Sequence, residues 1–260
     1  MNLSEELLEA FKGFSGAHGQ TDVSQERTAG KQKAKSFIVR NPLTLELIEG
    51  HISGKKGIGA IPINEENKCR FGALDIDEYP LDHNKLIDKL EELKVPCIVC
   101  RSKSGGAHIF FFFKEWMNAG DFRDKAAEIS SALGHGRCEI FPKQEQILVE
   151  RGDVGNFINL PYFDSEQTLR YAIIRREGAY VEASLSEFIE EIQKVKTLPK
   201  DFLTLPIGGP VDLLPNYIPC LRTKLAIGVF EGERNRTAFQ LGVFLQRLDP
   251  GNWKIKFEEH

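Results

Sequence analysis

The sequence predicts an α+β fold with a ferredoxin-like (RRM-like) core, an N-terminal α/β extension and a small C-terminal helical segment. Apolar runs and amphipathic segments over residues 71–141 follow the order strand, helix, strand, strand, helix, strand. That is the order of the ferredoxin-like unit. With 260 residues, 41% of them hydrophobic and 28% charged, the chain also has the composition of an ordinary globular protein.

The first expected strand runs through the apolar residues 71–74 and ends in Asp75-Ile76-Asp77. Side chains alternate along a strand, so Asp75 and Asp77 lie on one face. Two carboxylates on one face suit a hard divalent cation such as Mg²⁺, bound together with phosphate oxygens. Taken alone, the pair could equally be a solvated strand end.

The next elements lead to a candidate phosphate-binding loop. Asp82 is expected to cap a helix that ends near Lys94, and residues 95–100 form a short buried strand. The loop after this strand is rich in small residues, and its amides, a hydroxyl and two cations suit phosphate oxygens. The candidate residues of this loop are Arg101, Lys103, Ser104, Gly105 and Gly106.

Two further strands complete the predicted unit. Residues 108–113 include four consecutive Phe, which indicate a buried central strand, although sheet aromatics that stack on RNA bases are an alternative. A helix over 120–133 precedes a strand over 137–141 that contains Glu139. The ferredoxin-like order places the first strand between the third and the fourth. We therefore expect Asp75, His108 and Glu139 to converge on one face of the sheet.

Three segments resemble the motifs of a known family. Asp75-Ile76-Asp77, the run from Ser104 to His108 and residues 138–144 are similar to the three motifs of the archaeo-eukaryotic primase superfamily. More narrowly, they resemble the primase-polymerases of phages, plasmids and bacterial mobile or conflict elements. The resemblance covers a motif core over residues 43–163.

The resemblance implies that Asp75, Asp77 and Glu139 bind two divalent ions, Mg²⁺ or Mn²⁺. It also implies that Ser104 and His108 hold the triphosphate of an incoming NTP or dNTP.

Two positions carry weaker implications. Lys143 stands where related proteins have a Lys after the third carboxylate, and the resemblance implies that it contacts phosphate or template. The chain has Gly106 where many members of the family have Ser. If the hydroxyl of Ser104 does not reach the phosphate, the backbone amides of Gly105 and Gly106 must do so.

The function implied is that of a template-directed DNA primase or polymerase, which extends a primer on single-stranded DNA by a two-metal mechanism. A non-catalytic single-stranded nucleic-acid-binding domain is one alternative, which the three carboxylates disfavour. A replication-initiator nuclease on a related fold is another, and it would require a paired His metal site and a nucleophilic Tyr on a helix.

Basic residues before the motifs are candidates for contacts with template or primer phosphates. The net charge of −4 argues against a protein that coats nucleic acid nonspecifically, but it leaves room for a local basic groove. A solvated flexible segment is the alternative interpretation. The candidates are Lys31, Lys33, Lys35, Arg40, Lys55 and Lys56.

The predicted domains are a catalytic domain over 1–200, a Pro-rich linker over 201–218 and a helical appendage over 219–260. Arg234 and Arg236 begin the second appended helix and either contact phosphate or are ordinary surface charges. The appendage is short, which suggests a piece of a longer protein with a fused or associated helicase. No signal peptide or apolar run of 18 residues is present, so we expect no membrane contact and a location in the cytoplasm of a bacterial or phage-infected cell.

Overall fold

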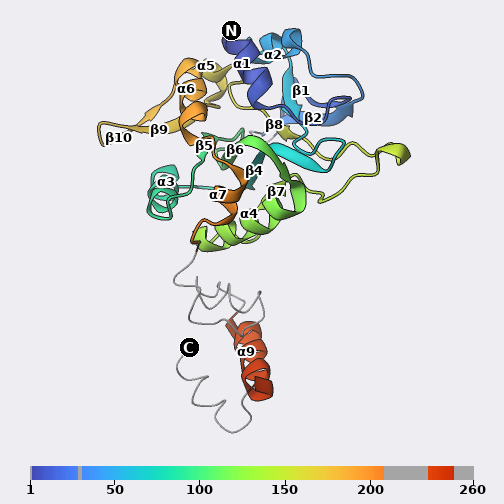
Figure 1. Cartoon of the computed structure of the whole chain (residues 1–260). Coiled ribbons are helices and arrows are strands. Elements are labelled where there is room, and N and C mark those ends of the chain that lie inside the picture. Colours follow the sequence, from blue (N-terminus) through green and yellow to red (C-terminus); the bar gives the residue numbers. More distant parts are fainter. Residues whose placement is uncertain (1, 29–30, 208–233, 249–260) are drawn as a thin grey trace. The chain divides into compact units, whose positions relative to one another are not determined.

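The computed structural model describes residues 2–28, 31–207 and 234–248 (Figure 1). The chain divides into two compact units, one of residues 1–126 and 138–205 and the other of residues 127–137 and 206–260. Two antiparallel sheets and several helices form the described part. The predicted α+β class is therefore confirmed.

The larger sheet has six strands in the order β10-β9-β5-β6-β4-β7. Strand β4, next to the edge strand β7, pairs with β6 on one side and with β7 on the other, both antiparallel. This is the position that the sequence predicts for the first strand of the unit. The strands are β4 (Lys68–Ile76), β5 (Ile98–Arg101), β6 (Ala107–Asn118), β7 (Glu139–Phe141), β9 (Ala172–Arg176) and β10 (Ala179–Glu182).

Helices α3 (His83–Glu92) and α4 (Ala119–Leu133) follow β4 and β6 in the chain. Helix α3 begins as predicted, because the Asp82 carboxylate accepts a hydrogen bond of 3.1 Å from the backbone N–H of Lys85. The strand expected at 95–100 starts only at 98, because the N–H of Val95 still donates to the carbonyl of Leu90 at the helix end.

One face of the larger sheet is covered by aromatic side chains of α4 and of α7 (Pro199–Leu203). Phe111 and Phe113 contact the rings of Phe122 and Phe202, with centroids 5.1–5.8 Å apart. All four Phe of the run in β6 are at most 1% exposed. The run therefore belongs to a buried strand inside the sheet, as the interpretation of it as a central strand predicts.

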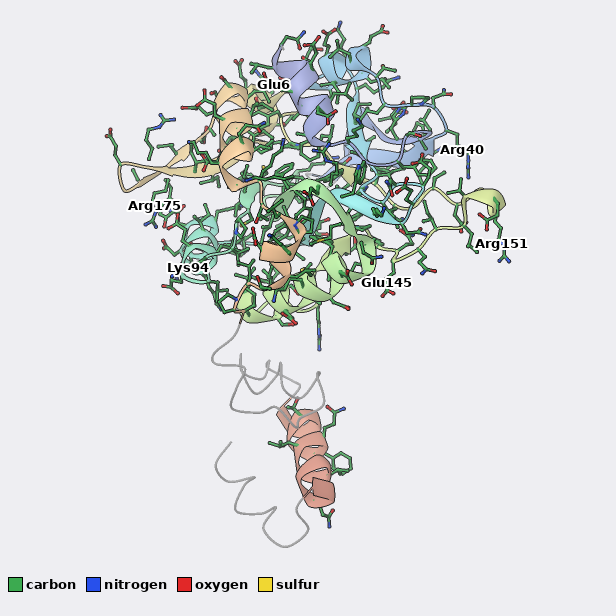
Figure 2. The ribbon with its side chains drawn as sticks, in the orientation of Figure 1. Glu6, Arg40, Lys94, Glu145, Arg151 and Arg175 are labelled. Atoms are coloured by element: carbon green, nitrogen blue, oxygen red, sulfur yellow. The ribbon has the colours of Figure 1, made fainter. Side chains whose placement is uncertain are left out.

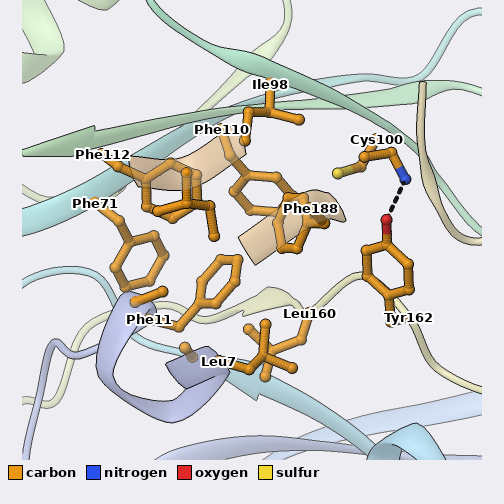
Figure 3. Packing of buried hydrophobic residues seen from close by; sticks show 14 of the residues in the cluster. Leu7, Phe11, Phe71, Ile98, Cys100, Phe110, Phe112, Leu160, Tyr162 and Phe188 are labelled. Carbon is orange, nitrogen blue, oxygen red and sulfur yellow. Dashed lines mark hydrogen bonds between the residues drawn. The ribbon is translucent and has the colours of Figure 1, made fainter. Parts of the chain in front are cut away.

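The opposite face packs on the N-terminal helix α1 (Leu3–Ala10) and on α6 (Leu185–Val195). Phe11 makes edge contacts with the rings of Phe71, Phe110 and Phe112, and its ring lies stacked near that of Phe188 (Figure 3). Ser184 followed by Glu187 predicts a capped helix start, and helix α6 begins with a capping box in which the backbone and side chains of these two residues bond reciprocally. The main core thus lies on the same face of β4 as its odd-numbered residues.

A second, four-stranded sheet has the order β2-β1-β3-β8. The apolar pattern of residues 156–160 predicts a strand that extends the main sheet, and this prediction is wrong: β8 pairs with β3, and Leu160 N–H donates to the carbonyl of Ile58. Apolar patterning identified this segment as a strand but not its partner. The pattern of residues 168–174 predicts a second such strand, and β9 does lie in the main sheet beside β5. The strands of the smaller sheet are β1 (His18–Thr28), β2 (Lys31–Val39), β3 (Gly57–Ala60) and β8 (Ile158–Asn159).

Helix α2 (Leu45–Ile52) is joined to the smaller sheet by a buried histidine. Nδ1 of His51 accepts from the N–H of Ile58 at 2.9 Å, and Nε2 lies 2.9 Å from the carbonyl of Pro161. Burial lowers the pKa of His51 to about 4, so this side chain is neutral at pH 7. Short helices at Val149–Arg151 and α5 (Ser165–Thr168) complete the connections of this unit.

A short helix lies where the predicted catalytic domain meets the predicted linker. Helix α7 continues to Leu203, and Phe202 is fully buried against the main sheet. The predicted linker from 208 onward and the first appended helix lie outside the described residues. Helix α9 (Arg234–Leu248) corresponds to the second appended helix. No helix in the described ranges is both long and apolar enough to cross a membrane.

Gly72 provides a test of the packing between β4 and α4. A Cβ atom on Gly72 would lie 2.2 Å from Cζ of Phe122, so Gly72→Ala must displace this buried ring. We expect a loss of about 1–3 kcal/mol in the free energy of unfolding, measured by equilibrium urea denaturation. The control is Gly50→Ala in α2, where a Cβ would meet no atom within 4 Å. That change should stabilise the protein by roughly 0.5–1 kcal/mol, and a Gly72→Ala variant as stable as wild type would contradict the packing.

Candidate functional site

Three predicted residues form one row across three neighbouring strands of the main sheet, β6, β4 and β7. Asp75 on β4 lies opposite His108 on β6 and opposite Glu139 on β7. Directly opposed residues of antiparallel strands share a face of the sheet. Nε2 of His108 lies 3.4 Å from Oδ1 of Asp75, and the two side chains are only 12% and 19% exposed. We refer to these residues as the Asp75 row.

Asp77 lies just beyond the end of β4 and is exposed. Its Oδ1 accepts a hydrogen bond of 2.7 Å from the hydroxyl of Tyr79. The pKa of the Tyr79 phenol is raised, chiefly by partial desolvation. A hydrogen bond with Ser104 opposes this shift, whereas the hydrogen bond to Asp77 and the charges of Asp77 and Asp75 add to it. Tyr79 therefore connects the carboxylate pair with the small-residue loop.

The loop itself is held close to β4. A Cβ on Gly106 would lie 2.1 Å from the carbonyl oxygen of Ile76, so a Ser at this position would clash with the backbone between the two Asp. This contact gives a physical reason for the departure from the family pattern. The carbonyl of Gly106 lies 3.0 Å from Nε2 of His83, and the N–H of Gly105 donates to the carbonyl of Ser102. The amide of Gly105 is therefore already used inside the turn.

The other predicted loop cations lie around this turn. The guanidinium of Arg101 lies near Gly105, because a Cβ there would be 3.5 Å from its Nη2. Partial burial and then the positive charge of Arg170 lower the pKa of Lys103. Lys103 and Arg170 are therefore neighbouring cations.

Lys143 is at the site, but it is bound to a carboxylate. Its Nζ lies 2.7 Å from Oε2 of Glu139 and 5.0 Å from the centroid of the Phe141 ring. The Glu139 side chain is 55% exposed, far more than those of Asp75 and His108. The Asp75 row is therefore mostly buried at His108 and Asp75 and exposed at Glu139, which lies on the edge strand β7.

Two buried polar residues beside the row were not predicted from the sequence. Ser102 and Arg170 are 6% and 7% exposed, and Oγ of Ser102 and Nε of Arg170 have no hydrogen-bond partner in the described part of the chain. The Arg170 guanidinium lies 4.9 Å from the centroid of the Phe163 ring. Burial lowers the pKa of Arg170 to about 10, which leaves it protonated at pH 7.

These two residues escaped prediction for different reasons. Ser104 was chosen as the loop hydroxyl by the resemblance, although Ser102 is the buried one. Arg170 lies far from the motifs in sequence, and only the pairing of Ala172 with Cys100 brings it to the site. Ser102 and Arg170 each lie two positions from the paired residues Cys100 and Ala172. This spacing would have placed them on one face of the sheet if the partner of β9 had been known.

The fit of this site to a divalent ion is partial. Among the described residues, no group of three or more His, Cys, Asp or Glu side chains is arranged to hold a metal ion. Two of the three candidate carboxylates are engaged instead by Tyr79 and Lys143. Oδ1 of Asp75, however, is buried without a hydrogen-bond partner, and such an oxygen is stabilised by a nearby cation. The donors thus fit in type and in position along the sheet, but they are not gathered into a ligand set.

The predicted nucleic-acid contacts belong to other elements than the main sheet. Arg40 follows β2 (Figure 2). Its Nη2 donates to the carbonyl of Gly152 at 2.8 Å. Lys35 lies on β2, and Lys55 and Lys56 are exposed after α2. The side chains of Lys31, Lys33, Arg234 and Arg236 lie outside the described residues.

One comparison with known proteins identifies a family. A family model for the archaeo-eukaryotic primase domain of TOTE conflict systems matches residues 9–199. This range contains the Asp75 row, the loop, Ser102 and Arg170. No curated protein matches the chain.

Proposed function

The chain belongs to the archaeo-eukaryotic primase family of TOTE conflict systems, and we propose that it is a template-directed DNA primase or polymerase. In this proposal it transfers nucleotides from NTPs or dNTPs to a 3′ hydroxyl on single-stranded DNA. The observation that carries it is the register of Asp75 with both His108 and Glu139, beside a loop built for close approach. The strand order β5-β6-β4-β7 supports the ferredoxin-like assignment of the core.

Asp75, Asp77 and Glu139 are the proposed ligands of two divalent ions, Mg²⁺ or Mn²⁺. Such ions, when bound, neutralise the triphosphate and activate the 3′ hydroxyl. Tyr79 and Lys143 occupy two of these carboxylates, so binding requires their contacts with Asp77 and Glu139 to open. Lys143 would then be released toward a phosphate of the nucleotide or template, as the family resemblance implies.

His108 is proposed to donate a hydrogen bond to the triphosphate. Its ring makes an edge contact with the ring of Phe110, with centroids 5.7 Å apart, and its Nε2 lies beside the carboxylate of Asp75. A side chain held in this way loses little conformational entropy when it binds a ligand.

A non-catalytic single-stranded nucleic-acid-binding domain is the second candidate, favoured by the engaged carboxylates of Asp77 and Glu139. A gel assay separates the two candidates. It follows incorporation of NTPs and dNTPs on single-stranded DNA, with and without a primer, in Mg²⁺ or Mn²⁺. Incorporation that depends on the template sequence supports the enzyme, and DNA binding without incorporation under every condition supports the second candidate.

Substitution of either Asp should abolish incorporation. Asp75→Ala and Asp77→Ala each remove a proposed metal ligand, and a loss of several kcal/mol of transition-state stabilisation, about a thousandfold or more in rate, is expected. Thermal unfolding and DNA binding should stay close to wild type. Asp88→Ala is the control, because this carboxylate pairs with Arg175 on the surface. Incorporation within about tenfold of wild type in either site variant would remove the metal assignment.

Substitution of His108 should act mainly on nucleotide capture. His108→Ala removes one hydrogen bond to an anion, worth about 1.5–3 kcal/mol, which is roughly ten- to a hundredfold. We expect most of this loss in the KM for the nucleotide, measured in steady-state primer extension. The assignment fails if both KM and kcat are unchanged.

Glu139→Gln removes a ligand charge at nearly constant volume. Incorporation should fall steeply in Mg²⁺ and recover in part in Mn²⁺, which accepts the same carboxylate ligands and binds nitrogen and amide donors more readily. Glu145→Gln is the matched control, since Glu145 is an exposed carboxylate six residues further on. Equal rates for the Glu139→Gln and Glu145→Gln variants would show that Glu139 is not a ligand.

A further inference from the structure

An apolar pocket lies at the C-terminal end of α1, between the turn after this helix, the end of β3 and the segment before α2. Its volume is about 310 Å³, at the lower end of the range for ligand sites. None of the described residues of the Asp75 row, or of the loop after β5, lines it. The large apolar side chains that line it are those of Leu8, Phe11, Phe14, Leu43 and Ile61.

The pocket is formed in advance, because the turn after α1 is tied to the segment that follows β3. The N–H of Phe14 donates to the carbonyl of Ile61 at 2.9 Å, and a Cβ on Gly13 would lie 1.9 Å from the same oxygen. The N–H and the hydroxyl of Ser15 both donate to the carboxylate of Glu65. A ligand therefore binds here without first ordering the turn, which lowers the entropy cost of binding.

Apolar side chains around the pocket remain in contact with water. Leu8, Phe14 and Leu43 are each only partly buried, and Leu3 on the same helix is 40% exposed. Apolar surface that is left open over neighbouring residues marks an interaction site. A molecule that buries an apolar side chain against these residues is therefore favoured by the hydrophobic effect.

The two helices beside the pocket are acidic. Helices α1 and α2 contact each other (Figure 1), and within their bounds they have five Glu and no Lys or Arg. Glu9 lines the pocket itself, where it pairs with Arg70 at 3.1 Å and with Lys12 at 3.5 Å. The pocket also lies at the negative end of the α1 dipole. The five carboxylates are those of Glu5, Glu6, Glu9, Glu46 and Glu49.

These charges decide between the classes of partner. A nucleic-acid backbone or an anionic lipid surface would be repelled by the carboxylates of α1 and α2. A basic protein segment is attracted to them, and its apolar side chains supply what the pocket lacks. Charge and apolar surface thus favour the same partner, which is a protein segment with an apolar anchor between Lys or Arg residues.

We propose that this pocket is a docking site for a basic segment of a partner protein. The segment inserts an apolar side chain against Leu8, Phe14 and Leu43, and its Lys or Arg side chains lie beside α1 and α2. An apolar anchor in a pocket, surrounded by a charged rim, is the usual arrangement at protein interfaces. The inference is independent of the proposed nucleotidyl transfer, because it uses none of the residues assigned to that reaction.

Three labelled peptides of about 15 residues test the chemistry of the site on the unmodified chain, with fluorescence anisotropy as the measurement. The first is an amphipathic helix of Leu and Lys, the second has Glu in place of Lys, and the third has Ser in place of Leu. We expect only the Leu–Lys peptide to bind, with an affinity that falls severalfold when NaCl is raised, since salt screens exposed charges. Equal binding of either other peptide would overturn the proposal.

A matched pair of variants tests the pocket. Leu8→Lys places a cation on its wall and removes an apolar contact, so binding of the Leu–Lys peptide should weaken on the order of tenfold or more. Leu3→Lys is the control, because it makes the same change on the same helix at a residue that does not line the pocket. Its affinity should stay within about twofold of wild type. Equal affinities of the two variants would overturn the assignment, and the comparison of peptides stays decisive if Leu8→Lys does not fold.

Two further measurements separate the other occupants. A benzophenone on the central Leu of the peptide should cross-link to α1, to the turn after it or to the segment at Leu43, and cross-links confined to other elements would overturn the site. Sedimentation velocity of the chain alone tests a second copy as the occupant. The expected result is no self-association that depends on Leu8, and self-association that Leu8→Lys abolishes would replace the partner protein by a second copy.

Discussion

The pairing of β4 between β6 and β7 is the constraint on which the rest of the structure depends. Its backbone hydrogen bonds fix Asp75 opposite His108 and Glu139, and they place Gly72 and Phe111 against the ring of Phe122. A slip of one residue would turn the odd-numbered face of β4 toward α4 and bring a carboxylate among Phe rings. The apolar packing on both faces therefore holds the register that assembles the polar row at the end of the strand.

The polar groups without partners are concentrated at this end of the sheet. Five buried side-chain atoms lack a hydrogen-bond partner in the described part of the chain, and three of them belong to Asp75, Ser102 and Arg170. Native proteins satisfy most buried polar groups, so a cluster of exceptions indicates a site whose ligand supplies the missing contacts. The arrangement places a carboxylate on β4 and a guanidinium near the start of β9, which suits a ligand that is anionic along its length and bound to cations at one end.

Local rules in the sequence predicted the elements that local physics determines. The Asp82 cap, the box at Ser184 and the buried Phe run all depend on neighbours within a few residues, and each appears as expected. Convergence of the motif residues followed from a topology rule applied to the strand order. Contacts between segments far apart in sequence were out of reach, because alternation gives the face of a residue but not the partner of its strand.

The same limit explains what the sequence misjudged or left out. The segment of β8 lies in the smaller sheet because it pairs with β3, a strand that precedes the first Asp motif by more than ten residues and lies about 100 residues from β8 in sequence. Arg170 enters the site only through the pairing of β9 with β5. The contact of Lys143 with Glu139 is local in sequence. The resemblance implies instead that Lys143 contacts a phosphate, a group that belongs to a ligand and not to the protein.

The proposed chemistry requires the carboxylates of β4 and β7 to act together on one nucleotide-bound cation. A crystal structure with Mn²⁺ and a non-hydrolysable nucleoside triphosphate would show this, because the anomalous signal locates the ion. We expect an ion with oxygens of Glu139 and of Asp75 or Asp77 within about 2.0–2.6 Å, and Lys143 moved away from Glu139. A bound nucleotide with no ion on the Asp75 row, and with Lys143 still paired to Glu139, would contradict it.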